Sequence, residues 1–518
     1  MRQAVIVFHG MGEQVPMTTV RSFVESVWRE DDKLIDRDRP DAITGEKRSE
    51  NAAWTRPDAR IGSFEIRRIT TEKGDNDYYT DFFEFYWAHL VHGTTLDQVT
   101  AWICDLLFRR WGRVPPGVRG AWIALWIVTL LLVAVAVWSV LPKEDVTGWF
   151  SPYLSVLMAA FSLFSTWFVS NVLIKRFGDV VRYVKADPPN IDRRQEIREE
   201  GVKFLTKLLT ETRTVKRGRK TVEVPEFDRV IVVAHSLGTI VAYDVLSEAF
   251  AQLSQTYDKT LNDELRHPAR AELEKEVRQA LGVEGKDAQA EALTPKRYHD
   301  LQDAAREELI AFGTPWRVSN FVTLGSPLTH AEFLMAEDVA DLRAQQRERG
   351  LATCPPMPEF DRATDTYHFT FRQGSVAKIG KLTDEEKDDP QAEMTLPRRP
   401  HHAALFGYTR WTNIYSPHWA LATGDIISGP LEHQFGLHMQ DREPFSGIQD
   451  FAVMPELDAG TEGPARNHRR RFMSHNAYWA MDGGTELHTE RDPDDPERLL
   501  SPHHIRMLRE ALGLWRPR

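Results

Sequence analysis

The sequence predicts an α/β protein, because runs with the character of strands lead directly into segments with the period of helices. The clearest case is 229–246, RVIVVAHSLGTIVAYDVL. Its β-branched residues at 230–233 precede a turn of mostly small residues, after which apolar residues recur at helical spacing. A second apolar run, 4–8, ends in a glycine-rich turn, and further strand-like runs lie at 318–324 and 410–415. Strands followed by turns and helices are the units from which α/β folds are built.

The composition is that of a globular protein. The chain has 518 residues, 42% of them hydrophobic and 27% charged, which is enough for a sizeable core in about three domains or in one large domain with insertions. The net charge of −11 argues against a nucleic-acid partner, because no broad basic face is expected. The two cysteines, Cys104 and Cys354, exclude a disulfide framework and a cysteine-rich metal site, and they fit a reducing compartment.

Ser236 is at the tip of the turn in Ala-His-Ser-Leu-Gly. A serine hydroxyl is a weak nucleophile unless a base lies beside it and a backbone N–H can receive the oxyanion, and a sharp strand-to-helix turn presents it in that way. Strand and helix approach closely at such a turn, which suits the small residues Ala234 and Gly238. The alternative is an ordinary turn without a catalytic role.

This stretch resembles the nucleophile elbow of the α/β-hydrolase superfamily, usually written G-x-S-x-G. Ala234 replaces the first glycine, a departure that is also familiar in bacterial lipase-like members. The resemblance implies a doubly wound, mostly parallel sheet, with Ser236 as the nucleophile and the N–H of Leu237 as one oxyanion donor.

After the first strand, His9, Gly10, Met11 and Gly12 resemble the HG-x-G loop of lipases and esterases. That resemblance implies that the N–H of Met11 acts together with the N–H of Leu237 to hold an oxyanion. A generic glycine turn is the alternative. A dinucleotide-binding loop is disfavoured because no third glycine follows at the required spacing.

The remaining segments extend this α/β pattern. A helix is expected at 18–28, a polar surface loop at 31–60, and strands at 62–69 and 81–87. The stretch from about 252–312 is rich in charged residues and alanine with helical patterns, which indicates a solvated helical insertion.

The strand at 318–324 ends in Leu-Gly-Ser-Pro-Leu, which makes Ser326 a second candidate nucleophile. It is disfavoured because Pro327 lacks the N–H that the residue after an α/β-hydrolase nucleophile donates. The region at about 335–405 shows little periodicity and is expected to be a cap or loop region.

Two uncharged apolar runs, 121–141 and 149–174, are each long enough to cross ~30 Å of hydrocarbon. They predict two transmembrane helices in a tight hairpin, and the alternative is a pair of buried core helices. Basic residues flank the outer ends of the pair, which places both ends in the cytoplasm. The chain also begins with a strand pattern and not with a cleavable leader, so secretion is not expected.

These boundaries predict three parts and a location. The first part of the hydrolase-like domain, with the oxyanion loop, is 1–100, a membrane insertion is 101–190, and the second part of the domain is 191–518. The expectation is an integral protein of a bacterial cytoplasmic membrane, with the bilayer as partner and the catalytic domain on the cytoplasmic side.

A serine nucleophile needs a histidine base, which in turn needs an acid to fix its tautomer. The family order Ser, acid, His implies Asp425, in a Gly/Ser-rich turn after the strand at 410–415, and His475, in His-x-x-Tyr-Trp. Rival candidates for the acid and the base remain open, namely Asp361, Asp365, His418, His433, His438 and His468.

Other polar clusters suggest less. His235 within the elbow is expected to be structural. The arginines before His475, at 466 and 469–471, are read as a solvated cluster, with an anionic lipid headgroup as the alternative ligand. The histidine pairs at 401–402 and 433/438 lack H-E-x-x-H spacing, so a metal site is not expected. No cofactor is expected either, because a serine mechanism needs none.

The sequence therefore predicts a membrane-anchored serine hydrolase that cleaves carboxylic esters through a Ser-His-Asp acyl-enzyme mechanism. Lipid or acyl esters are the expected substrates, because the predicted hairpin holds the site near the bilayer. A protein deacylase or thioesterase, an amidase, and a non-catalytic hydrolase-like membrane scaffold are the alternatives.

Overall fold

The protein is described from a computed structural model of the 518-residue chain. The described residues are 2–11, 15–31, 40, 44–47, 50–72, 79–90, 104, 107–115, 117, 119–140, 183–184, 188–255, 267–282, 293–362, 364–372, 398–418, 424–438, 445–455, 474–480, 491–492, 495–499 and 501–514.

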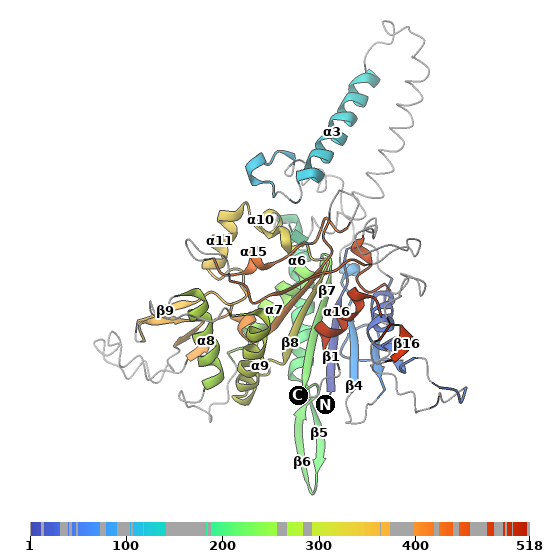
Figure 1. Ribbon diagram of the computed structural model, residues 1–518, viewed down its shortest axis with the longest axis vertical. Coiled ribbons are helices and arrows are strands. Elements are labelled where there is room, and N and C mark those ends of the chain that lie inside the picture. The colour runs from blue at the N-terminus through green and yellow to red at the C-terminus, as the bar shows by residue number, and fades with distance from the viewer. Residues whose placement is uncertain are drawn as a thin grey trace.

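An eight-stranded mixed sheet forms the centre of the molecule, in the order β14-β13-β8-β7-β1-β4-β3-β2 (Figure 1). Neighbouring strands from β14 to β4 run parallel, and β3 and β2 are added antiparallel at one edge. The strands are β1 (Arg2–Phe8), β2 (Ala53–Arg56), β3 (Arg68–Thr71), β4 (Tyr79–Phe85), β7 (Arg229–His235), β8 (Val318–Leu324), β13 (Arg410–Tyr415) and β14 (Gln449–Ala452).

The central strands are apolar on both faces because both faces are covered by helices. In β1, Ile6 and Phe8 belong to one core cluster while Val5 and Val7 belong to the other, as the two-residue period of a strand requires. The first cluster contains side chains from α6 (Pro188–Thr210), α7 (Gly238–Leu253), α8 (Pro268–Leu281) and α9 (Pro295–Ala311), and the second contains side chains from α1 (Thr18–Val24), η1 (Glu25–Arg29) and α16 (His503–Leu512).

The remaining elements lie around this sheet. A two-stranded hairpin of β5 (Thr212–Arg217) and β6 (Lys220–Pro225) projects from the end opposite α3 (Arg119–Val140) (Figure 1). Shorter pieces are η2 (Ala88–Leu90), η3 (Trp111–Arg113), η8 (Pro327–His330), α10 (Ala331–Leu334), α11 (Val339–Arg347), β9 (Glu359–Asp361), β10 (Thr366–His368), β11 (Thr370–Arg372), β12 (Arg398–Pro400), η9 (Leu405–Gly407), α15 (Glu432–Phe435), η11 (Ser474–Asn476), β15 (Arg491–Asp492) and β16 (Asp495–Leu499).

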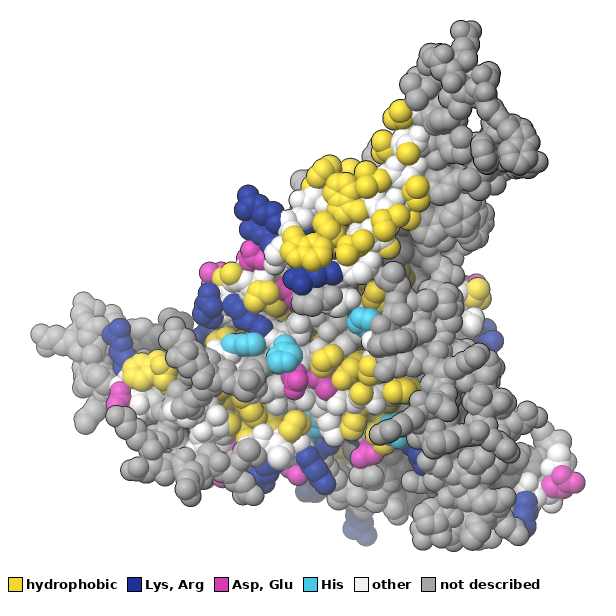
Figure 2. Space-filling model, turned by 45° about the horizontal axis from the view of Figure 1, so that its top comes forward, with side chains coloured by type: hydrophobic (Ala, Val, Ile, Leu, Met, Phe, Trp, Pro, Cys, Tyr) yellow, Lys and Arg dark blue, Asp and Glu magenta, His cyan; other side chains and the backbone are white. Residues whose placement is uncertain are grey.

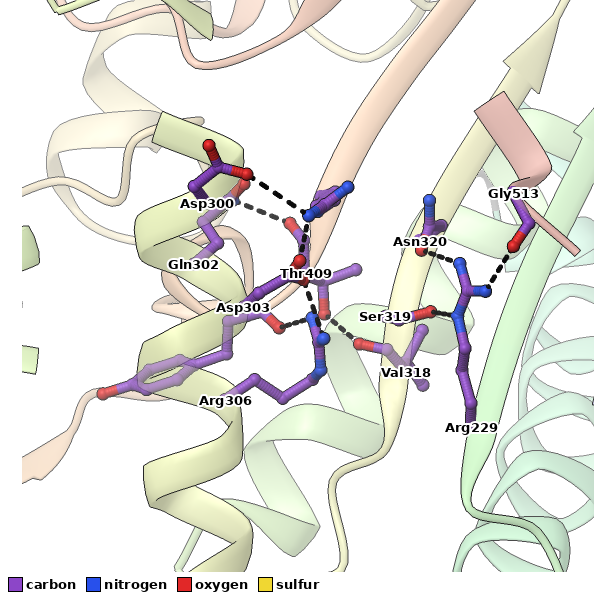
Figure 3. A network of polar contacts seen from close by, with 12 residues as sticks. Arg229, Asp300, Gln302, Asp303, Arg306, Val318, Ser319, Asn320, Thr409 and Gly513 are labelled. Carbon is purple, nitrogen blue, oxygen red and sulfur yellow. Dashed lines mark hydrogen bonds and ion pairs between the residues drawn. The ribbon is translucent and has the colours of Figure 1, made fainter. Parts of the chain in front are cut away.

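Arg229, the first residue of β7, ties the C-terminal helix to the sheet (Figure 3). Its guanidinium donates to Ser319 Oγ at 2.7 Å, to Asn320 Oδ1 at 2.9 Å and to the carbonyl oxygen of Gly513 at 2.9 Å. On the other side of β8, Thr409 Oγ1 donates to the carbonyl oxygen of Val318 at 3.1 Å. These contacts join neighbouring strands at their amino ends, whereas Ser236 lies at the carboxyl end of β7.

Several segments differ from their expected positions. The helix expected at 18–28 is α1 continued by one π-helical turn, and the strand expected at 62–69 is β3, which starts later. β2 lies within the expected loop at 31–60. It is an edge strand with mostly exposed side chains, so it lacks the apolar alternation from which a strand is recognised.

The predicted transmembrane hairpin and integral-membrane location are wrong. The run at 121–141 does form α3, but none of the helices in the described part of the chain combines the length and apolar content that a membrane crossing needs. The first turns of α3 pack on protein. Trp126 Nε1 donates to the carbonyl oxygen of Leu107 at 3.1 Å, and the rings of Trp122 and Trp111 lie 5.8 Å apart. The second predicted span, 149–174, lies outside the described residues.

Farther along α3, apolar side chains lie on the surface (Figure 2). Ile127, Leu130 and Val133 are each more than half exposed. The segment before α3 is attached to the elements that follow β8: Arg109 Nη1 donates to the carbonyl oxygen of Phe333 at 2.8 Å, and Arg113 pairs with Asp338 at 3.2 Å. The base of α3 therefore lies at the end of the molecule where β8 terminates.

Candidate active site

The parallel strands β1, β7, β8 and β13 end at the same edge of the sheet, where α/β proteins usually carry their sites. Ser236 follows β7 directly and Gly325 follows β8. Asp425 lies in the chain after β13. The topology therefore brings segments that are far apart in the sequence to one place.

Ser236 sits on a strained strand-to-helix turn. Its φ of 54° is in the left-handed region, which costs a non-glycine residue about 1–3 kcal/mol, and residues strained in this way cluster at active sites. Its N–H donates to the carbonyl oxygen of Leu324 at 3.0 Å, which fastens the turn to β8. Gly238 must be glycine, because a Cβ there would lie 2.3 Å from the carbonyl oxygen of His9.

The three residues that the sequence proposes as a catalytic triad lie in hydrogen-bond contact. Ser236 Oγ is 2.8 Å from His475 Nε2, and His475 Nδ1 is 2.9 Å from Asp425 Oδ2. An ionised carboxylate only accepts, so Nδ1 carries the ring proton and Nε2 is left to accept the serine hydroxyl proton. Ser236, His475 and Asp425 are thus aligned, with the imidazole in the tautomer that base catalysis would need.

Asp425 is held as a carboxylate. Its side chain is buried, which by itself would raise the pKa, but hydrogen bonds from His475 and Tyr478 outweigh burial and lower the pKa to about 2. The N–H of Ile427 donates to the second oxygen, Oδ1, at 3.0 Å. The acid is therefore charged at any pH near neutrality and stabilises a protonated His475.

Tyr478 is a site residue that the sequence reasoning missed. Its hydroxyl donates to Asp425 Oδ2 at 2.7 Å and accepts from the N–H of Ser416 at 3.0 Å. The same hydroxyl lies 2.9 Å from Ser428 Oγ. The sequence feature that could have identified Tyr478 is the spacing His-x-x-Tyr, which places this ring next to His475. An aromatic residue at such a position is more often part of the hydrophobic packing.

Gly325, in Leu-Gly-Ser-Pro-Leu, lies directly against Asp425 and His475. It has a φ of 58°, and a Cβ on it would lie 2.6 Å from a ring carbon of Tyr478, 3.1 Å from Asp425 Oδ2 and 3.2 Å from His475 Nδ1. Any side chain would displace the acid–base pair. The sequence motif was read as a turn, and its glycine is explained by this close approach.

The expected oxyanion loop lies beside the nucleophile. A Cβ on Gly10 would be 2.9 Å from the Cβ of Ser236, so the backbone passes the serine closely. Leu237 is the N-cap of α7, and the N–H of a residue in this position takes no part in the hydrogen bonds within the helix. Met11 continues the loop, and Gly12 lies outside the described residues.

His9 fixes the start of this loop. Its Nδ1 donates to the carbonyl oxygen of Gly10 at 2.7 Å, and its Nε2 accepts the N–H of Trp87 at 3.1 Å. The two rings stack at 5.1 Å between centroids. Burial lowers the pKa of His9 to about 4, so the ring is neutral and keeps this tautomer near neutral pH.

The rival serine and acids are placed elsewhere. Ser326 is buried, its Oγ is 2.8 Å from Thr239 Oγ1, and it accepts the N–H of Leu328 as the N-cap of η8. Asp361 pairs with Arg398 beside β9 and β12. Asp365 is an exposed turn residue with a φ of 52°.

The rival histidines do not take the place of His475. His418 is half-buried, and one of its ring carbons lies 3.9 Å from where a Cβ on Gly117 would be. His433 is largely exposed beside Glu432, and His438 Nε2 donates to the carbonyl oxygen of His433 at 2.7 Å. His468 and the arginines at 466 and 469–471 lie outside the described residues.

Within the described residues, neither a metal-ligand cluster nor the groove along α6 coincides with this site. Within the described part of the chain, no group of three or more His, Cys, Asp or Glu side chains is arranged to hold a metal ion. A groove of about 940 Å³ is lined by α6 and by Glu248 and Gln252 of α7. Glu248 is ten residues along α7 from Gly238, which corresponds to about 15 Å of helix. The groove is therefore not the site that contains Ser236.

Comparison of the chain with protein-family models, with curated proteins and with solved structures finds no significant match. The function must therefore be inferred from the residues at the carboxyl edge of the sheet and from their geometry.

Proposed function

We propose that this protein is a serine hydrolase that cleaves carboxylic esters through an acyl-enzyme. The observation that carries the proposal is the continuous hydrogen-bond chain from Ser236 Oγ through the ring of His475 to Asp425, with the serine held at a positive φ on a strand-to-helix turn. This arrangement is the recognised geometry of an activated serine, independent of the fold that carries it.

The proposed reaction has two halves. His475 Nε2 takes the proton of Ser236 Oγ as the oxygen attacks the ester carbonyl carbon, and the imidazolium then gives that proton to the leaving alcohol. Water next loses a proton to His475 and attacks the acyl-serine, which releases the carboxylic acid and returns the proton to Ser236. Asp425 stays ionised throughout and stabilises the imidazolium.

The N–H of Leu237 and the loop at Gly10 and Met11 supply the proposed oxyanion site. The N–H of Leu237 lies at the start of α7, where the helix dipole also favours negative charge. The close passage of Gly10 past Ser236 is what a second donor from this loop requires. Removing one such donor typically costs about 10²-fold to 10³-fold in rate.

The expectation of lipid esters is withdrawn, because it rested on the membrane hairpin. Esters remain the proposed class. Thioesters and amides are the alternatives within the same chemistry, since a Ser-His-Asp site attacks all of them. A panel of activated ester, thioester and anilide substrates of one acyl group separates them by kcat/KM.

The test is labelling of the purified full-length chain with a fluorophosphonate, which reacts with activated serines. The wild type is expected to be labelled and Ser236→Ala is not. Ser326→Ala is the matched control: it loses a buried hydroxyl on the neighbouring strand end and is expected to keep the label. A folded wild type that takes no label contradicts the proposal and leaves the non-catalytic scaffold as the better description. A Ser236→Ala protein that is still labelled contradicts the assignment of Ser236 as the nucleophile.

A further inference from the structure

The ring of His235 lies between the nucleophile strand and the segment that carries the base. His235 is the last residue of β7 and directly precedes Ser236. Its Nε2 is 2.7 Å from the carbonyl oxygen of His475. Its ring centroid is 4.9 Å from that of His475 and 4.9 Å from that of Trp479, which it meets edge-on.

The protonation of His235 follows from these contacts. A carbonyl oxygen only accepts, so Nε2 must carry the proton and donate it to His475. Burial and the neighbouring charge of His475 lower the pKa of His235 to about 3, so the ring is neutral near neutral pH. Nδ1 faces the oxyanion loop, where a Cβ on Gly10 would lie 3.1 Å from it.

Serine and base are far apart in the chain, so their spacing depends on how the segment 474–480 is anchored. The N–H of Ser474 donates to the carbonyl oxygen of Gly424 at 3.2 Å, and Trp479 Nε1 donates to Ser22 Oγ at 3.0 Å. These anchors lead to other parts of the molecule. The bond from His235 starts from the residue next to the nucleophile and ends on the backbone of the base itself.

We propose that His235 is a positioning residue, which sets the distance between Ser236 Oγ and His475 Nε2 by holding the backbone of His475 to the nucleophile strand. This inference rests on the proposed serine-hydrolase function. His235 does not itself exchange a proton with the substrate. Its neutral ring donates one fixed hydrogen bond, so the base can become charged and discharged in each cycle while its backbone stays in place.

The test compares variants that keep or lose the donor. His235→Gln places an amide N–H at a reach similar to that of Nε2, whereas His235→Phe keeps a flat ring without a donor. His235→Asn, one methylene shorter than glutamine, is a second variant that keeps an amide but does not reach the carbonyl. Activity on an activated ester, the rate of fluorophosphonate labelling and the melting temperature are measured for all three.

We expect His235→Phe and His235→Asn to lower kcat and the labelling rate by about 10-fold to 100-fold with KM nearly unchanged, because small misplacements of catalytic groups cost that much. His235→Gln should recover most of that loss. The matched control is His504→Phe: His504 Nε2 contacts the carbonyl oxygen of Ala480, in the same segment, at 3.1 Å, so its loss should lower stability and leave kcat unchanged.

The outcomes separate the two proposals. Suppose that the wild type is labelled. The positioning role is then overturned if His235→Phe has the same kcat as the wild type, or if His235→Gln is as slow as His235→Phe and His235→Asn. A folded wild type that is neither labelled nor active overturns the serine-hydrolase function itself, and the positioning role falls with it.

Discussion

Tyr478 and His475 donate to the same atom: the tyrosine hydroxyl is 2.7 Å, and the imidazole Nδ1 is 2.9 Å, from Asp425 Oδ2. The two donors come from one short segment, so a single piece of chain delivers both the base and the group that orients the acid. The tyrosine also accepts the N–H of Ser416, which connects this segment to the end of β13. Two donors from this segment therefore orient the same oxygen of the acid.

Tyr478→Phe should lower kcat/KM about 10-fold, which corresponds to about 1.4 kcal/mol of lost orientation of the acid. Losing a hydrogen bond to the charged Asp425 should also cost about 1.5–3 kcal/mol of stability. Steady-state kinetics and thermal unfolding measure the two effects. Tyr243→Phe is the matched control: its buried hydroxyl donates to the carbonyl oxygen of Ala352 at 2.8 Å, so stability should fall while kcat/KM is kept. Equal kinetics in the two variants would count against a role for Tyr478 in orientation.

Asp425→Asn should reduce kcat by about 10³-fold to 10⁴-fold, because the amide favours the wrong tautomer of His475 and does not stabilise the imidazolium. Asp365→Asn is the control, since it makes the same chemical change at an exposed turn with a φ of 52° that asparagine tolerates. Full activity in Asp425→Asn would remove this residue from the mechanism.

The pH dependence follows from the same group. The pKa of Asp425 in the folded chain, about 2, is below its ordinary value of 3.8, so its stabilising contribution is present above that ordinary value and is lost as the pH falls through about 2. Activity that declines between pH 7 and pH 4 should therefore not report this carboxyl. Thermal unfolding from pH 2 to pH 6 should show the wild type losing, toward pH 2, the advantage that it holds over Asp425→Asn at higher pH.

Gly325→Ala should impair both stability and catalysis. A left-handed φ costs an alanine about 1–2 kcal/mol, and the new methyl group also meets Tyr478 and Asp425. Gly218→Ala is the matched control, because Gly218 has a φ of 63° with open space around it. Both variants should lose stability, and only Gly325→Ala should lose kcat, by about 10²-fold if the acid–base pair moves by about 1 Å. Unchanged kcat in Gly325→Ala would contradict the close packing described above.

Glu84→Gln should stabilise the protein at alkaline pH. Burial raises the pKa of Glu84 from 4.5 to about 7, although hydrogen bonds from Met17 and Thr19 oppose the shift. Because the folded-state pKa is raised, the protonated acid contributes stability that is complete below about 4.5 and is lost as the pH rises through about 7. The loss is about 3 kcal/mol at 1.36 kcal/mol per pKa unit.

Melting temperatures at pH 5 and pH 8 measure this effect. The wild type should lose stability relative to Glu84→Gln between the two values, because glutamine accepts the N–H of Met17 without a buried charge. Glu223→Gln, on the exposed strand β6, should follow the wild type. Parallel curves for the wild type and Glu84→Gln would show that Glu84 is ionised throughout.

The membrane prediction rested on hydropathy, which averages over a run of side chains and does not see which of them contact protein. In the run at 121–141, Trp122 and Trp126 pack on the segment that ends near Arg113, whereas Ile127, Leu130 and Val133 are exposed. Only the folded chain shows that contact.

By itself, the sequence determined the elements that neighbouring residues encode: the strand–turn–helix around Ser236, the glycine-rich turn after β1, and a set of acids and histidines in the right chain order. It did not determine which histidine reaches the serine or which acid reaches that histidine. Tertiary structure alone decided that His475 contacts Ser236 and that Asp425 contacts His475, with Tyr478, Gly325 and His235 around them. The physical reason is that strand and turn propensities act over a few residues, whereas these contacts join residues 50 to 240 positions apart, and their geometry exists only when the parallel strands end at one edge.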